Sequence, residues 1–146
     1  MKKLLFIFSF FSTALLQAQS KSGTKTADKT SILQLLNRQK EDWNRGDIDG
    51  FMNGYWENDS LMFVGKSGVT YGWAKTLNNY KKGYPDTAVM GKLSFDYIRV
   101  KRLSKKYYFV VGKWYLKRSI GDISGHYNLL LEKINGQWVI IVDHSS

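Results

Sequence analysis

Two ionisable side chains in the second half of the sequence have the residue types for acid–base chemistry, Asp96 and His126. Asp96 stands between Phe95 and Tyr97 in a strand-forming segment. A carboxylate among aromatic residues of a strand needs a functional or structural explanation. If Asp96 and His126 converge in a cavity, each could raise the other's basicity or orient a substrate. The alternative is structural: His126 lies near a sheet edge and Asp96 pairs with a neighbouring lysine or arginine. The sequence leaves both hypotheses open.

The C-terminal residues contain the side-chain types of a hydrolase triad: Asp143, His144 and Ser145. Adjacent residues of a strand point to opposite faces, so these three cannot form a catalytic relay together. Of two adjacent side chains in this segment, we expect one to close a pocket or anchor the first helix. We expect the other to lie on the outer face of the sheet. Asp59, which follows Glu57-Asn58, could face the mouth of a pocket, but capping of a turn is the simpler role for it.

The composition excludes several kinds of chemistry. The sequence contains no cysteine, which excludes disulfides, thiolate zinc sites, a cysteine nucleophile and lipid attachment at a cysteine. Two histidines without cysteine form no metal-binding pattern, so we expect no metal and no cofactor. The formal net charge is +10, but the basic residues occur as scattered pairs. No arginine-rich run or nucleic-acid motif is present, so we expect no nucleic-acid partner.

Residues 1–18 have the pattern of a cleavable signal peptide. Two lysines precede an apolar stretch from Leu4 to Leu16, and Ala18 supplies the small residue before the cleavage point. This stretch is shorter than the roughly 20 residues that a membrane-spanning helix needs. We therefore expect an exported protein, periplasmic or secreted, with no stable membrane anchor after cleavage. Residues 19–30 are rich in Ser, Thr and Lys and predict a flexible linker.

Helical patterns dominate the first half of the remaining chain, residues 31–146. Helical spacing begins at Ile32, and its apolar face continues through Gln39 to Trp43. Gly46 and Asp47 predict a tight corner into a second, short helix. A short strand at residues 61–64 and a turn follow, and a third helix carries Trp73, Leu77 and Tyr80. The stretch to residue 92 is expected to be a loop.

Strand patterns fill the second half. Aromatic and β-branched residues predict strands at 93–103, 107–118, 122–134 and 137–144. Asn135-Gly136 suits a two-residue hairpin turn, because both central positions need positive φ. Helices followed by consecutive antiparallel strands predict one α+β domain with helices packed on one sheet face.

Several stretches in this order resemble one superfamily. They are Trp43-Asn44-Arg45-Gly46-Asp47, Tyr55-Trp56-Glu57-Asn58-Asp59, Tyr71-Gly72, Gly112-Lys113-Trp114, Gly125-His126-Tyr127-Asn128-Leu129 and the closing residues 136–146. Together they resemble the cone-shaped superfamily of nuclear transport factor two, scytalone dehydratase, ketosteroid isomerase and the SnoaL-like polyketide cyclases. The function-unassigned SnoaL-like branch is the most similar. The resemblance implies a cone-shaped, curved antiparallel sheet packed on three N-terminal helices, with an apolar pocket at its open end.

The resemblance also implies where a site would lie. In the isomerase branch an acid near the end of the first strand and a tyrosine in the first helix carry the chemistry. Here the strand ends in Phe63-Val64-Gly65 and the matching helix surface carries Gln39, so that constellation is not expected. Aromatic residues with a polar tip suit the lining of such a pocket. The expected ligand-binding residues are Phe63, Tyr71, Trp73, Tyr80, Trp114, His126 and Asn128.

Three functional hypotheses follow. The first is a domain that binds a small apolar or amphipathic molecule in the cone. The second is a lyase, isomerase or cyclase that uses Asp96 and His126. The third is an interaction module that forms a homodimer through the outer sheet face. Tyr107, Phe109, Val111 and Tyr115 would contribute to that face if they point outward.

Overall fold

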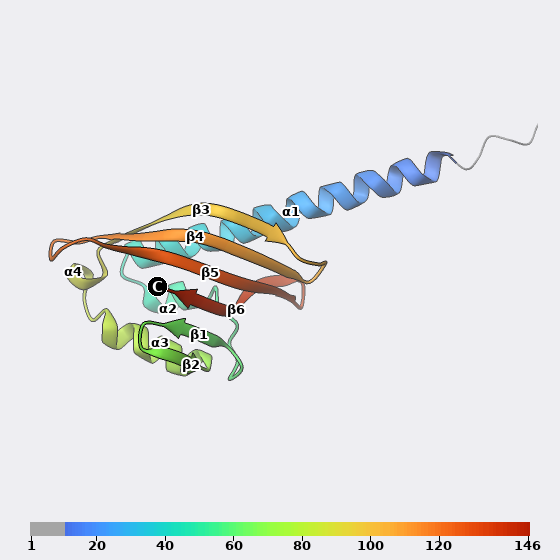
Figure 1. The fold of residues 1–146 in the computed structure, drawn as a ribbon. Helices are drawn as coiled ribbons and strands as arrows, with labels where there is room; N and C mark the ends of the chain where they lie inside the picture. The colour runs from blue at the N-terminus through green and yellow to red at the C-terminus, as the bar shows by residue number, and fades with distance from the viewer. Residues whose placement is uncertain (1–10) are drawn as a thin grey trace, which may run out of the picture.

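The first helix supplies one layer of the domain. The computed structural model describes residues 11–146, with helix α1 at Phe11–Asn44. Its buried residues recur at helical spacing, as predicted: Ile32, Leu36 and Gln39 are at most 3% exposed. Figure 1 shows α1 running along the sheet and extending beyond it at its N-terminal end. This helix therefore covers the sheet with one apolar face.

A glycine–aspartate corner joins α1 to α2 (Ile48–Met52). Gly46 has a φ of +85°, a conformation that glycine adopts without steric cost. The Asp47 carboxylate then accepts a hydrogen bond from the Gly50 amide at 2.7 Å and caps α2. Both features confirm the predicted corner.

The next segment contains two elements beyond the predicted ones. Strand β1 (Met62–Gly65) and helix α3 (Trp73–Gly83) agree with prediction. Strand β2 (Gly68–Tyr71) pairs with β1 through a tight turn, and the single turn α4 (Thr87–Met90) lies in the expected loop. Both additions are only four residues long, too short for a periodic pattern to reveal.

Four long strands complete the sheet: β3 (Lys92–Arg102), β4 (Tyr107–Lys117), β5 (Ile123–Ile134) and β6 (Gln137–Ser145). Consecutive strands pair in antiparallel fashion, and β1 pairs in parallel with β6. The sheet order is β2-β1-β6-β5-β4-β3. Asn135 and Gly136 have positive φ values of 50° and 82°, as the predicted hairpin turn requires.

Irregular pairing bends this sheet. The register shifts between Tyr97 and Arg99 in β3 and between Leu130 and Leu131 in β5, and such bulges increase local curvature. The result is a curved, unclosed six-stranded sheet with the helices on its concave side (Figure 1). The predicted α+β fold with a cone-shaped sheet is confirmed.

The N-terminal boundary of the packed domain lies earlier than predicted. Residues 19–30 belong to α1 and do not form the expected flexible linker. Asp28 is 5% exposed and accepts hydrogen bonds from Lys133 Nζ at 2.8 Å and Trp138 Nε1 at 3.2 Å. The Lys25 carbonyl accepts one from the Tyr108 hydroxyl. Composition missed these contacts because they join residues far apart in sequence.

The predicted signal peptide lies largely outside the described residues, which begin at residue 11. Within them, no helix combines the length and the hydrophobicity that a membrane crossing requires.

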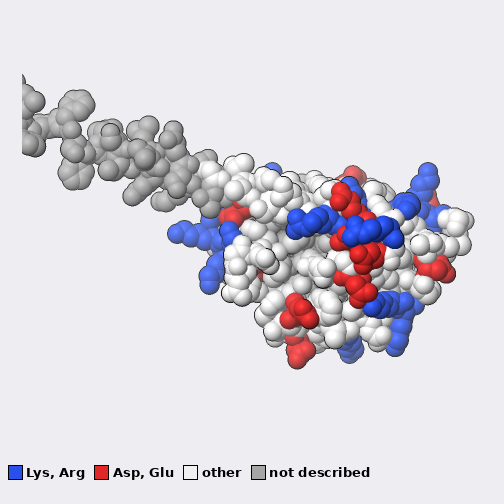
Figure 2. Space-filling view, turned by 180° about the vertical axis from the view of Figure 1, so that it is seen from behind, with Lys and Arg blue, Asp and Glu red and all other residues white. Residues whose placement is uncertain are grey.

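Charge is distributed over the surface without one dominant basic patch on the face in Figure 2. There, acidic side chains gather in a central band and basic side chains lie on both sides of it. On this face the basic side chains are scattered and solvated, as their occurrence in separate pairs along the sequence predicted.

Candidate functional site

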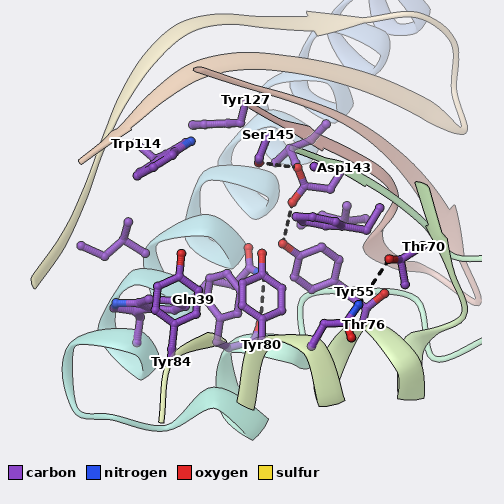
Figure 3. A pocket seen from close by; sticks show the side chains of 18 of the residues that line it. Gln39, Tyr55, Thr70, Thr76, Tyr80, Tyr84, Trp114, Tyr127, Asp143 and Ser145 are labelled. Atoms are coloured by element: carbon purple, nitrogen blue, oxygen red, sulfur yellow. Dashed lines mark hydrogen bonds between the residues drawn. The ribbon is translucent and has the colours of Figure 1, made fainter. Parts of the chain in front are cut away.

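A cavity of about 510 Å³ lies between the concave sheet face and helices α1 and α3. Figure 3 shows tyrosine side chains from the helical side facing Trp114 and Tyr127 of the sheet. Most of the lining is apolar or aromatic, and the polar groups concentrate at a few positions. The volume and the lining are typical of a site for a small molecule.

A carboxyl group at the inner end of the cavity is the central polar feature. Asp143 is 3% exposed. Its carboxylate accepts hydrogen bonds from the Tyr55 hydroxyl at 2.7 Å and the Ser145 hydroxyl at 2.8 Å. Asp143 and Ser145 share the inner face of β6 because they are two residues apart in a strand. Tyr55 follows α2 and is held against β6 by a bridge to Ile140.

Burial changes the acidity of this cluster. It raises the pKa of Asp143 from 3.8 to about 6, although the hydrogen bonds from Tyr55 and Ser145 and the nearby His144 oppose the rise. Burial, and then Asp143, raise the pKa of Tyr55 well above 10 and that of Tyr80 likewise. At neutral pH the cavity therefore holds one carboxylate beside neutral phenols.

Aromatic rings form the helical wall. Trp43, Phe51, Tyr80 and Tyr84 contact one another, mostly edge to face, with ring centroids 4.7–6.1 Å apart. Phe63 of β1 joins this wall through Tyr80. Edge-to-face ring contacts of this kind stabilise the wall beyond the burial of apolar area.

Gln39 ties the wall to the chain behind it. The side chain is 3% exposed, and its amide nitrogen donates to the Phe51 carbonyl at 2.9 Å. The amide therefore links α1 to α2.

The sheet side of the cavity contains two polar atoms without a partner. Trp114 Nε1 and the Tyr127 hydroxyl are buried and have no hydrogen-bond partner within the described residues. Gly112 makes room for this packing, because a Cβ there would overlap the Tyr127 hydroxyl. Tyr127 also packs edge to face on Phe95.

Three of the seven predicted ligand-binding residues line the cavity: Phe63, Tyr80 and Trp114. Trp73 does not. Its Nε1 donates to the Met52 carbonyl, and its ring packs against the core. Tyr71 is 61% exposed, because β2 lies at the sheet edge and presents this residue away from the cavity.

Asp96 and His126 do not converge in the cone. The register aligns Asp96 with Lys113, and Lys113 with His126, so all three lie on the outer face. Both Asp96 and His126 are exposed, and Asp96 accepts a hydrogen bond from the Tyr115 hydroxyl. Asn128 shares their face. The predictions of Asp96 and His126 as a catalytic pair, and of His126 and Asn128 as ligand contacts, are therefore wrong. Strand alternation places all three on the outer face of the sheet, away from the cavity.

The polar cluster of the cavity was only partly foreseen. Asp143 faces the cavity and His144 is exposed, as the alternation argument predicted for adjacent residues. Asp143 and Ser145 share a face because they are two residues apart in β6. No sequence signal indicated Tyr55, because its hydrogen-bond partner lies 88 residues away.

The prediction for Asp59 concerned a turn. Asp59 is exposed, and the turn contact comes from Asn58, whose side chain accepts a hydrogen bond from the Ser60 amide.

Within the described residues no group of three or more His, Asp or Glu side chains could hold a metal ion. The polar cavity residues are a single carboxylate, two exposed lysines, hydroxyls and amides. This set can orient a polar group of a ligand or accept a proton.

The sequence matches no family model and none of the curated proteins. Solved structures give a clear match. An NTF-2 like protein of unknown function from Shewanella oneidensis MR-1 is 46% identical; the alignment covers 82% of this chain and 98% of that one, with a TM-score of 0.79. The chain therefore belongs to the NTF2-like family.

More distant structures share the fold. An NTF2-like protein of unknown function from Pseudomonas putida KT2440 is 16% identical over 83% of this chain and 87% of that one, with a TM-score of 0.67. A ketosteroid isomerase-like protein from Erwinia carotovora atroseptica is 18% identical, over 80% of this chain and 93% of that one, with a TM-score of 0.61. The Shewanella match confirms the superfamily that the sequence motifs suggested, and these more distant structures show the shared fold.

Proposed function

We propose that this domain binds a small, mainly apolar molecule in the cavity, with one polar group of the ligand at Asp143. The observation that carries the proposal is the combination of aromatic walls with a buried, hydrogen-bonded carboxyl at the inner end. Apolar walls supply affinity through desolvation, and a single polar group at depth supplies orientation.

The neutral dye N-phenylnaphthylamine tests this proposal, because its fluorescence rises in apolar sites. We expect saturable binding by the wild type. Leu116→Trp places an indole ring in the cavity wall and should abolish binding. The neighbouring residue Tyr115 lies on the outer face, so Tyr115→Trp should not affect binding. Circular dichroism should confirm that both variants fold. Equal binding by the two variants would place the dye elsewhere and refute the proposal.

A second candidate function is acid–base catalysis at Asp143 in place of the Asp96 and His126 pair. The supporting observation is the pKa of about 6, which leaves a buried carboxylate that can accept a proton at neutral pH. We expect the wild type to accelerate exchange of deuterium from solvent into the carbon beside the carbonyl of an aromatic ketone such as tetralone. Asp143→Asn should remove the acceleration, and Asp96→Asn should keep it. Exchange at the uncatalysed rate would exclude this function for such ketones.

We further propose that the outer sheet face pairs with a second copy of the chain. Phe109 and Val111 alternate with the buried Tyr108 and Val110 and so face outward, where both remain only partly exposed. Light scattering should give the mass of a dimer, and Val111→Glu should give a monomer. A monomeric wild type at micromolar concentration would contradict the proposal.

We also propose that the protein is exported and that its signal peptide is cleaved after Ala18. Expression of the full chain in a bacterial host should yield a mature protein that begins at Gln19, as mass spectrometry of the periplasmic fraction can establish. An intact N-terminus in that fraction would contradict cleavage.

A further inference from the structure

Two lysines lie among the residues that line the cavity, and both are exposed. Lys66 belongs to the turn between β1 and β2, and Lys82 to the last turn of α3. Because these side chains reach solvent while Asp143 is buried, the lysines mark the mouth of the cavity and the acid marks its inner end.

Local structure explains only part of this arrangement. A lysine in the last turn of a helix stabilises the carbonyl end of that helix, which accounts for Lys82. It does not account for Lys66, which lies in a β-turn. Neighbouring Lys81 pairs with Asp49 at 2.8 Å and does not line the cavity. Within the described residues, neither Lys66 nor Lys82 forms an ion pair with a carboxylate.

The charges of the cavity are therefore separated along its length. Among the described lining residues Asp143 is the only acid, and it is buried whereas both lysines are exposed. A ligand anion at the inner end would lose its hydration beside a carboxylate, which is unfavourable. The same anion at the mouth would keep part of its hydration and lie near two ammonium groups.

We propose that the ligand is an amphipathic anion, with its anionic group between Lys66 and Lys82 and its apolar body along Phe63, Tyr80 and Trp114. This inference rests on the proposed binding function and adds the charge and the orientation of the ligand. A carboxylate, sulfate or sulfonate on an aromatic or aliphatic body has this chemistry. The overall positive charge of the chain would favour the encounter with such a ligand.

A matched pair of dyes tests the proposal. Anilinonaphthalene sulfonate carries the ring system of N-phenylnaphthylamine with an added anionic group. At about 0.01 M salt, where the screening length is roughly 30 Å, the sulfonate should bind about threefold to tenfold more tightly than the neutral dye. At about 1 M salt, where that length falls to roughly 3 Å, the preference should disappear.

Charge-matched variants locate the effect. The double variant Lys66→Gln/Lys82→Gln should lose the preference for the sulfonate and still bind the neutral dye. Lys75→Gln/Lys105→Gln removes the same net charge from exposed positions that do not line the cavity, and it should keep the preference.

The outcomes separate the two proposals. If the neutral dye fails to bind, the binding function itself is wrong. If both dyes bind the wild type equally, or if the two double variants lose the preference to the same extent, the cavity binds ligand but the assignment of an anion at its mouth is wrong.

Discussion

Both faces of the sheet carry an aspartate, but the two aspartates lie in different environments. On the inner face of β6, Asp143 is buried, receives two hydrogen bonds and has a raised pKa. On the outer face, Asp96, Lys113 and His126 form a row across β3, β4 and β5, and the row is open to solvent. Burial distinguishes the faces, because a desolvated charge has few ways to be stabilised while an exposed one is stabilised by water.

The largest difference between the faces should appear in stability. Leu131 is fully buried on the inner face, and its neighbour Leu130 lies half-buried on the outer face. Leu131→Ala should lower the free energy of unfolding by about 2–5 kcal/mol, because it leaves a cavity in the core. Leu130→Ala should cost less than half as much. Urea denaturation measures both, and equal losses would show that the outer face is packed as tightly as the core.

The pH dependence of stability should differ next most. The folded pKa of Asp143, about 6, exceeds the unfolded value near 3.8, so the folded state binds the proton more tightly. Its contribution to stability is present below about pH 4 and is lost as the pH rises through about 6, a loss of about 1–3 kcal/mol. Asp143→Asn cannot ionise and should avoid this loss.

Urea denaturation at about pH 4 and about pH 8 checks this linkage. The stability of Asp143→Asn relative to wild type should increase between the two values. Asp96→Asn on the outer face should show no such increase. A parallel pH profile for wild type and Asp143→Asn would contradict the raised pKa.

A smaller effect should appear within the inner cluster. The Tyr55 hydroxyl lowers the pKa of Asp143, so Tyr55→Phe should raise that pKa further, by about half a unit to one unit. Tyr84→Phe removes a hydroxyl from the same cavity without touching Asp143. A carbon-detected NMR titration of the Asp143 carboxyl should shift in Tyr55→Phe and not in Tyr84→Phe. An unchanged titration in Tyr55→Phe would show that this hydrogen bond does not affect the pKa of Asp143.

The smallest effect is expected on the outer row. His126→Ala should change the free energy of unfolding by less than about 0.5 kcal/mol, as is usual for exposed positions. Binding of N-phenylnaphthylamine should also be unchanged. A loss of dye binding in this variant would return His126 to the list of ligand contacts.

Much of the fold was predictable because local patterns carried it. The apolar face from Ile32 to Trp43, the Gly46-Asp47 corner and the Asn135-Gly136 turn each depend on residues close in sequence. Strand β2 and helix α4 escaped prediction because four residues show no clear period. Residues 25–30 escaped for another reason: their packing depends on Asp28 meeting Lys133 and Trp138 across the fold.

The site was predictable only in part. Phe63, Tyr80 and Trp114 were found because large aromatics in a cone-shaped fold either fill the core or line its cavity. Which acid enters the cavity was missed, because Asp96 and Asp143 both stand in apolar strand segments of the sequence.

The sequence by itself determined most of the longer elements, the absence of cysteine chemistry and the rule that Asp143 and His144 face opposite ways. Each of these follows from composition or from near neighbours. Only the tertiary structure decided which face of the sheet the helices cover. That choice buried Asp143 beside Tyr55 and left Asp96 and His126 in water. The physical reason is that strand alternation specifies two faces but not which one is desolvated; the packing of α1 and α3 against the curved sheet specifies that.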